Sequence, residues 1–347
     1  MPEKFVSLEK SLLKEVKSFL LKEGMKCEFT QQGLIELIDL LFTYKEEGKF
    51  LFPQLYIIDD LKMFAKVLSP SKFHKIGADN KSSQTFLEAV KKCAPLTEDG
   101  WAIYILRLPS TFEYGVFRSG TNILSVPISE IIISKEPPLQ PAILVYQTAG
   151  KLVEVRGAKG NSIVTNFSTK NQITLSPLQV HEKFIDCIIK NVNEDYKDQA
   201  RIFFRKLFLK VHQTGHGTLI AVVDYNSEDF PDILKDGIRL DFKIDIIEAI
   251  AALGTESPLI TNSKIEGYFT LLKGMLSSDG VTILGNDGSI RGYNIFITHK
   301  GSTTTKEKFG GSRKRTFNTL IANFDSILIA AYVQSQDGNI QFIENEK

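Results

Sequence analysis

Cysteine is scarce in this chain of 347 residues, which contains only Cys27, Cys93 and Cys187. The three lie far apart and show no spacing that is typical of metal ligands. So sparse and odd a set argues against a disulfide framework and favours a reducing compartment. We therefore expect each thiol to be a small buried apolar group rather than a reactive or metal-binding one.

A strong charge of either sign and a long apolar run are also missing. The formal net charge is +1, whereas proteins that bind nucleic acid or membrane surfaces usually carry a large basic excess. The longest apolar runs, such as residues 327–333, are too short to cross a bilayer, and residues 1–4 do not begin the apolar core of a signal peptide. These features predict a cytoplasmic protein without a membrane partner, and they argue against a nucleic-acid partner.

The length and composition predict two ordinary globular domains, with 43% hydrophobic and 24% charged residues. Residues 1–175 are predicted to form an α+β domain, because helical periodicity at the start gives way to short alternating strands. The expected helices are 6–23, 31–43 and 84–94, and the expected strands are 101–108, 114–118, 123–126, 131–134, 142–147, 152–156 and 162–167. Nothing in this part has catalytic spacing, which favours binding or sensing.

Residues 176–347 are predicted to form a second domain, with residues 176–213 as a helical lead-in that breaks near 191–193. Ser176-Pro177 is typical of a helix start, and the apolar run at 218–224 is typical of a strand buried on both faces. The expected elements after it are a turn at 235–238, helices at 244–253 and 265–277, strands at 281–284 and 292–298 around a turn at 286–288, a helix at 316–323, and strands at 327–333 and 339–343. The predicted fold class is α/β (α+β): a C-terminal mixed, twisted sheet flanked by helices, preceded by a separate α+β domain.

Basic residues are concentrated between residues 291 and 315, where seven lysines and arginines face one acid, Glu307. Gly310 and Gly311 would let the backbone approach a ligand closely. Residues 312–316 add hydroxyl donors, a lysine and two arginines, whose planar groups match phosphate oxygens. A helix starting directly after them would point its free N–H groups at the same anion. This composition is also found in RNA-binding loops, nuclear-localisation patches and plain surface turns.

Asp279 lies between a predicted helix and a predicted strand, at a sheet end where ligands of open α/β folds collect. A carboxylate beside a phosphate cradle can hold Mg²⁺ or Mn²⁺, which would neutralise developing charge and activate an attacking hydroxyl. On spacing alone, Asp279-Gly280 also fits an ordinary turn.

In the order of its motifs, the C-terminal part resembles the diadenylate cyclase domain, which makes cyclic di-AMP from two ATP molecules. Residues 217–220, Gly-Thr-Leu-Ile, correspond to the opening strand of that family, and residues 235–238 resemble its Asp-Gly-Gly turn. Residues 278–281, Ser-Asp-Gly-Val, stand for its Asp-Gly-Ala motif. Residues 311–316, Gly-Ser-Arg-Lys-Arg-Thr, stand for Gly-Thr-Arg-His-Arg-Thr/Ala, and the closing hairpin at Asp337-Gly338 also fits.

The resemblance implies a role for each matching residue. Asp279 would be the catalytic residue, serving both the metal and the 3′-hydroxyl nucleophile. Ile297 would contact the base region, and residues 312–316 would bind the phosphates. The full set implied to bind ATP is Gly280, Val281, Ile297, Gly311, Ser312, Arg313, Lys314, Arg315 and Thr316. The implied cofactor is Mg²⁺ or Mn²⁺.

The implied activity is that of a metal-dependent nucleotidyltransferase, which condenses two ATP into cyclic di-AMP and pyrophosphate. Positioning and charge stabilisation dominate such phosphoryl transfers. Because each monomer would hold one ATP, the resemblance implies a face-to-face homodimer or a higher homo-oligomer. Residues 1–175 resemble the sensor domains that precede this module in some bacterial signalling proteins, which implies gating by an unidentified small-molecule or protein signal.

Three features depart from the family pattern. Lys314 replaces a histidine, so that a fixed cation stands where the family has a titratable group and possible metal ligand. Residues 334–337 read Gln-Ser-Gln-Asp where the family usually carries Ser-Glu-Glu, and residues 242–266 resemble an insertion. The first two departures motivate an alternative: a catalytically weak or inactive nucleotide-binding regulatory protein.

Overall fold

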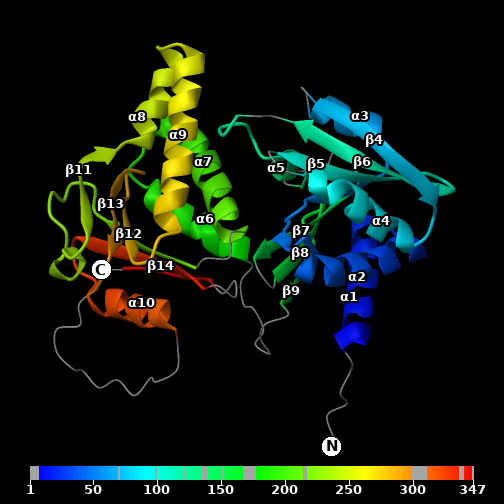
Figure 1. Cartoon of the computed structure of the whole chain (residues 1–347), viewed down its shortest axis with the longest axis horizontal. Coiled ribbons are helices and arrows are strands. Elements are labelled where there is room, and N and C mark those ends of the chain that lie inside the picture. Colours follow the sequence, from blue (N-terminus) through cyan, green and yellow to red (C-terminus); the bar gives the residue numbers. More distant parts are fainter. Residues whose placement is uncertain are drawn as a thin grey trace, which may run out of the picture. The chain divides into compact units, whose positions relative to one another are not determined.

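The computed structural model of the chain describes residues 8–68, 71–97, 100–119, 122–133, 140–149, 152–166, 177–213, 217–297, 311–335 and 340–345. It divides into two compact units: residues 1–121 with 125–170, and residues 122–124 with 171–347. Each unit packs helices on a mixed sheet, as Figure 1 shows, and the predicted α/β (α+β) class is confirmed. The predicted boundary at 175/176 lies in residues 167–176, outside the described part. No helix within that part is long and apolar enough to span a membrane.

The first unit is built on a seven-stranded sheet with the order β4-β6-β5-β3-β7-β8-β9, in which only β3 and β5 are parallel neighbours. Its helices are α1 (Leu8–Glu23), α2 (Glu28–Thr43), α3 (Leu61–Val67), α4 (Gln84–Cys93) and α5 (Ile128–Ile133). Its strands are the short pair β1 (Lys45–Glu46) and β2 (Lys49–Phe50), and β3 (Leu55–Ile58), β4 (Ser71–Asn80), β5 (Trp101–Arg107), β6 (Thr111–Ser119), β7 (Ala142–Ala149), β8 (Leu152–Gly157) and β9 (Ser162–Asn166).

Both faces of this sheet are buried at its central strands β3 and β5, whose alternate residues point to opposite sides, whereas β4 is largely exposed. In β3, Leu55 and Ile57 pack into the main core beneath α1, α2 and α4, where Cys93 is also buried. Tyr56 points to the other face and stacks edge-on against Phe117. Two expected strands are wrong here: 131–134 falls largely in helix α5, and 123–126 forms no strand.

The second unit is built on a six-stranded sheet with the order β11-β13-β12-β10-β14-β15, in which β10 and β12 are parallel neighbours. Its helices are α6 (Pro177–Ile188), α7 (Glu194–Gln213), α8 (Ile246–Ala251), α9 (Pro258–Leu276) and α10 (Ser312–Ala322). Its strands are β10 (Thr218–Val223), β11 (Ile238–Ile244), β12 (Val281–Gly285), β13 (Ile290–Ile295), β14 (Leu328–Gln334) and β15 (Ile340–Glu344).

Among the helices that the structure describes in this unit, α6 to α9 cover one face of the second sheet and α10 covers the other (Figure 1). The central strand β10 serves both cores: Ile220 and Val222 pack towards α6 to α9, whereas Leu219, Ala221 and Val223 pack towards α10. All six residues of β10 are buried, which agrees with the continuous apolar run in its sequence.

The largest differences from the expected elements of the second unit concern α9, α10 and β11. Helix α9 begins at Pro258 rather than at 265, because proline is pre-set for the first helical turn. Helix α10 begins at Ser312 rather than at 316. Strand β11 extends the sheet from Ile238, where only a turn was expected.

Candidate functional site

The Asp279 turn joins the end of α9 to the start of β12. Its conformation depends on Gly280, whose φ of +91° is in the left-handed region that favours glycine. The turn lies directly against β13, since a Cβ on Gly280 would be 2.9 Å from both the backbone nitrogen and the backbone oxygen of Ile295. The Asp279 carboxylate is consequently held at the sheet edge and turned outwards, with its side chain 84% exposed.

Helix α10 supplies the second half of the site through its first turn. Phe317 and Leu320 are buried and fix the helix to the sheet. Arg313 lies one turn before Phe317, so it emerges from the same side of the helix. Gly311 is the N-cap residue, and no side chain of the described part caps the helix there. The Lys314 N–H donates to the Gly311 carbonyl at 3.1 Å, so the N–H groups of Ser312 and Arg313 are those that would face an anion at this helix end.

An ion pair brings these two halves together across 34 residues of sequence: Arg313 Nη2 lies 3.1 Å from Asp279 Oδ1. The Arg313 side chain is 27% exposed. It projects from the side of α10 that packs on the sheet, which explains why it is less exposed than Asp279. Because the Asp279 side chain is exposed to water, the ion pair contributes little to stability. Asp279 or Arg313 can therefore give up this contact and bind a ligand instead. The structure thus joins a carboxylate, an arginine and a helix N-terminus at one place.

The remaining predicted residues do not all reach this place. Lys314 and Arg315 are exposed, and Arg315 is two residues before Phe317, hence on the opposite side of α10. The Thr316 hydroxyl donates to the carbonyl of Ser312 within the helix, at 3.2 Å. The Val281 side chain is fully buried in the core under α10, so only its backbone could face a ligand.

Gly311 and Ser312 are exposed at the open end of α10, whereas Ile297 is half-buried and packs against the core on the same side of the sheet. The basic residues between 298 and 310, the residues at 215 and 216, and the closing turn at 336–339 lie outside the described part of the chain. The predicted set is therefore divided: Asp279, Gly280, Gly311, Ser312 and Arg313 form one cluster, and Arg315 lies apart from it.

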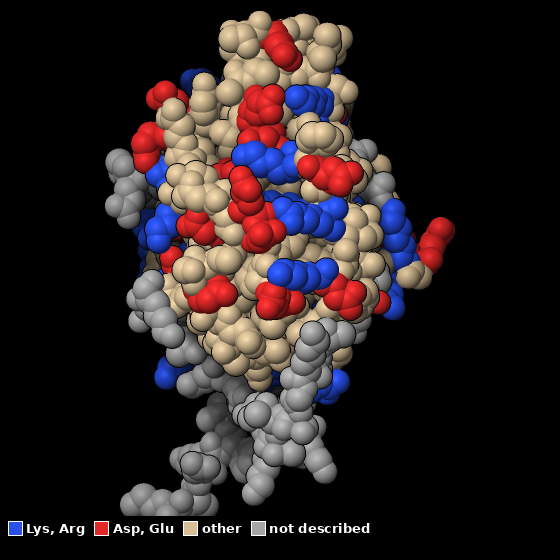
Figure 2. All heavy atoms as spheres, turned by 90° about the vertical axis from the view of Figure 1, so that its left-hand side faces the viewer, with Lys and Arg blue, Asp and Glu red and all other residues tan. Residues whose placement is uncertain are grey.

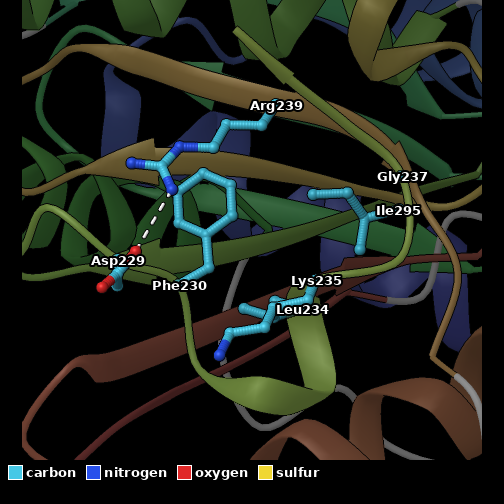
Figure 3. Close-up of a pocket in the computed structure, with 7 residues that line it drawn as sticks. All are labelled: Asp229, Phe230, Leu234, Lys235, Gly237, Arg239 and Ile295. Atoms are coloured by element: carbon cyan, nitrogen blue, oxygen red, sulfur yellow. Dashed lines mark hydrogen bonds and ion pairs between the residues drawn. The ribbon is translucent and has the colours of Figure 1, made fainter. Parts of the chain in front are cut away.

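A pocket lies on the β11 side of strand β13 (Figure 3), whereas the Asp279 turn leads into β12 on the other side of that strand. Its volume is about 240 Å³, and it is lined by Asp229, Phe230, Leu234, Lys235, Gly237, Arg239 and Ile295. Ile295 links the pocket to the Asp279 turn, because its backbone contacts both Gly237 and Gly280. Phe230 and Leu234 belong to the same core as Phe317 of α10, so the pocket and the cluster share one face of the sheet.

The sequence pointed to only part of this pocket. The turn at 235–238 was singled out by its resemblance, which covers Lys235 and Gly237. Asp229, Phe230 and Arg239 were missed, since no motif marks them. The only available signal was the apolar alternation of β11, in which Arg239 occupies a polar position between Ile238 and Leu240.

The residues present fit a divalent cation only in a limited sense. No group of three or more His, Cys, Asp or Glu side chains that could hold a metal exists within the described ranges. Asp279 is the one carboxylate of the cluster. Mg²⁺ sites commonly use one or two carboxylates together with substrate phosphates and water, so Asp279 would suffice as the protein ligand once a nucleotide is bound.

The charges on the β11 side of the second unit are mixed rather than uniformly basic. Figure 2, which views the molecule from the left of Figure 1, shows Lys and Arg side chains interspersed with Asp and Glu over the described part of this face. Several are paired, including Lys243 with Asp287 at 3.0 Å and Lys235 with Asp232 at 2.5 Å. Nucleic-acid binding needs a continuous basic surface, which this view does not offer.

No protein-family model matches the chain, and searches of curated proteins and of solved structures find no match to it either. The chemistry of the cluster and of the pocket is therefore the basis for any statement about function.

Proposed function

We propose that the protein is a diadenylate cyclase, which condenses two ATP molecules into cyclic di-AMP with release of two pyrophosphates. The observation that carries the proposal is the pairing of Asp279 with Arg313 at the N-terminus of α10. A helix N-terminus with an arginine suits a phosphate, and a carboxylate beside it suits an attacking hydroxyl. Two of the motifs that carry the resemblance to the cyclase family, at 278–281 and 311–316, are joined by this pair.

In each of the two transfers, the 3′-oxygen of one ATP bonds to the α-phosphorus of the other. The bond from that phosphorus to the bridging oxygen breaks, and pyrophosphate leaves with its electron pair. Asp279 orients the 3′-hydroxyl and accepts its proton. Arg313 and the first N–H groups of α10 bind the α-phosphate oxygens and stabilise the charge that develops on them.

Binding of ATP exchanges the Asp279–Arg313 pair for contacts with the ligand, because Arg313 turns to phosphate and Asp279 to the hydroxyl. A Mg²⁺ or Mn²⁺ ion bound by Asp279 and the phosphates would supply charge neutralisation and acidify the 3′-hydroxyl. Lys314 adds a positive charge beside the phosphates in place of the histidine of the family.

The reaction requires two bound ATP molecules facing each other, so we propose a face-to-face homodimer or a larger assembly as the active form. The first unit is proposed to gate this assembly in response to a small-molecule or protein signal. We place the activity in the cytoplasm, where ATP is the available substrate.

The test is incubation of the full chain with ATP and Mn²⁺ or Mg²⁺, followed by chromatography for cyclic di-AMP. Asp279→Asn should abolish product without lowering stability, because the side chain is exposed. Arg313→Ala should weaken ATP binding about tenfold, as expected for loss of a charge-assisted phosphate contact. Arg315→Ala is the matched control, because Arg315 lies on the opposite side of α10. This variant should change the affinity for ATP by less than about twofold.

A second candidate is a nucleotide-binding regulatory protein with little or no turnover, favoured by Lys314 and by the amide side chain of Gln334 near the closing hairpin. ATP binding that depends on Arg313, without any cyclic di-AMP in either metal, would establish this alternative and exclude the cyclase.

A further inference from the structure

The pocket on the β11 side of β13 has the walls of a site for a flat apolar ring. Phe230 forms an aromatic wall and is 7% exposed, while Leu234 and Ile295 are buried aliphatic walls. Gly237 lies directly against Ile295, since a Cβ there would lie 2.5 Å from Ile295 Cγ1, so the backbone itself forms the remaining wall. A planar ligand could therefore stack on Phe230 in contact with aliphatic side chains.

Arg239 closes the mouth of this pocket. Its guanidinium lies over the Phe230 ring, 5.1 Å from the centroid, and its Nη1 is 3.3 Å from Asp229 Oδ1. It also donates to the backbone carbonyl of Glu228. Arg239 is 55% exposed and Asp229 82% exposed, so the ion pair is weak and a ligand can displace the guanidinium from the ring (Figure 3).

The pocket and the Asp279 turn flank the same strand, β13, on one face of the sheet. Gly280 and Gly237 contact the same residue, Ile295, and Ile297 continues the chain from β13 on the same side of the sheet. A ligand bound at the Asp279 turn would therefore be separated from the pocket by a single strand, β13.

We propose that this pocket binds the purine base of the nucleotide and that Arg239 is the residue that determines its specificity; the inference rests on the proposed function. The base takes the place of the guanidinium on Phe230, and Arg239 then donates to N7. Both purines present this acceptor and pyrimidines do not. A purine also offers the larger face for stacking on Phe230.

The test uses nucleosides, which bind without the phosphate contacts. Adenosine, guanosine, cytidine and uridine are titrated into the full chain, and their dissociation constants are read from ligand-observed NMR. The parent chain should prefer the purines by about tenfold, and Arg239→Ala should reduce this preference to less than about twofold. Phe230→Leu keeps an apolar residue in the core but removes the aromatic ring, so it should weaken the binding of all four nucleosides.

Lys243→Ala is the matched control, since it removes a cation from the same strand. Lys243 binds Asp245 and Asp287, at 3.2 and 3.0 Å, and does not line the pocket. The purine preference should survive this change. Equal affinity for purines and pyrimidines in the parent chain, or an equal loss in Lys243→Ala and Arg239→Ala, would overturn the proposal.

Parallel titrations with ATP separate this proposal from the proposed function. If Arg313→Ala weakens ATP but the nucleosides show no dependence on Arg239, the base site is wrong and the phosphate site stands. If purine preference depends on Arg239 but Arg313→Ala leaves ATP affinity unchanged, the base site stands and the cyclase site is wrong.

Discussion

Gly280 determines how closely the Asp279 turn approaches strand β13. Its φ of +91° is poorly accessible to residues that carry a Cβ. A Cβ would also lie 2.9 Å from the carbonyl carbon of Asn294 and from the nitrogen of Ile295. Because these are backbone atoms, no side-chain rotation can relieve the contact. Glycine is required here by conformation and by space together.

We expect Gly280→Ala to lower the free energy of unfolding by about 2 kcal/mol, because the strain at positive φ adds to the backbone contact. Gly267→Ala is the control: it lies on the exposed side of α9, where a Cβ meets nothing within 4 Å. That change should raise the free energy of unfolding by about 0.5–1 kcal/mol. Urea unfolding measures both, and equal effects would contradict the steric role of Gly280.

At the scale of elements, α10 and β11 show what the sequence could and could not predict. Gly310-Gly311 followed by hydroxyl and basic residues has the composition of a loop, so a helix was expected only from 316. Phe317 and Leu320 anchor α10 to the sheet, and the helix extends back over Arg313 and Lys314, both good helix formers. Tertiary contact therefore decided where this helix begins.

Strand β11 has the alternating apolar pattern of a strand, but the turn residues directly before it favoured a loop. Ile238, Leu240, Phe242 and Ile244 alternate with charged residues, yet the preceding turn suggested only a loop. Its pairing with β13 is interrupted between Arg239 and Ile244. The pocket could not be predicted, because Phe230, Arg239 and Ile295 come from three segments that meet only when this edge strand has joined the sheet.

The helix pair α6–α7 packs on β14 through two buried histidines. A hydrogen bond of 2.9 Å joins His181 Nε2 to the Tyr332 hydroxyl, and the rings of His181 and His212 meet edge-on at 5.2 Å. Within the described residues, neither ring nitrogen of His212 has a hydrogen-bond partner. Burial lowers the pKa of both, to about 4 for His212, and the proximity of His212 lowers that of His181 further.

Both histidines therefore have a lower pKa in the folded chain than in the unfolded chain, and unfolding takes up protons below about pH 6.5. Their contribution to stability is complete above that pH and is lost as the pH falls towards 4. From pH 7 to pH 5, His212 alone should cost about 2 kcal/mol of unfolding free energy. Urea unfolding at both pH values measures this loss, which should shrink in His212→Gln; an unchanged loss in that variant would refute the assignment.

For the whole molecule, composition and periodicity were sufficient for the fold class, since five of the seven strands expected in the first unit and the buried run of β10 do form sheets. The strand order β11-β13-β12-β10-β14-β15 could not be predicted from the sequence, because it depends on pairing between strands far apart in the chain. The helices on its two faces follow from that order. The Asp279–Arg313 pair and the pocket at β11 and β13 likewise exist only in the assembled sheet.

The proposed reaction also belongs to the scale of the whole molecule, because one copy of the cluster cannot close the ring. Each 3′-hydroxyl attacks the ATP held by the other copy, so both copies must carry Asp279. If a fixed amount of parent chain is mixed with an equal amount of Asp279→Asn chain and the dimers exchange, about half of the parent–parent dimers are replaced by mixed ones.

We therefore expect the rate of cyclic di-AMP formation to fall to about half on addition of an equal amount of Asp279→Asn chain, although the amount of competent chain is unchanged. Addition of the same amount of Lys243→Ala chain, whose change lies outside the cluster, should instead raise the rate. Both rates are measured after incubation long enough for subunits to exchange. A rate unaffected by the Asp279→Asn chain would mean that each copy acts alone, and a face-to-face dimer would then not be the active form.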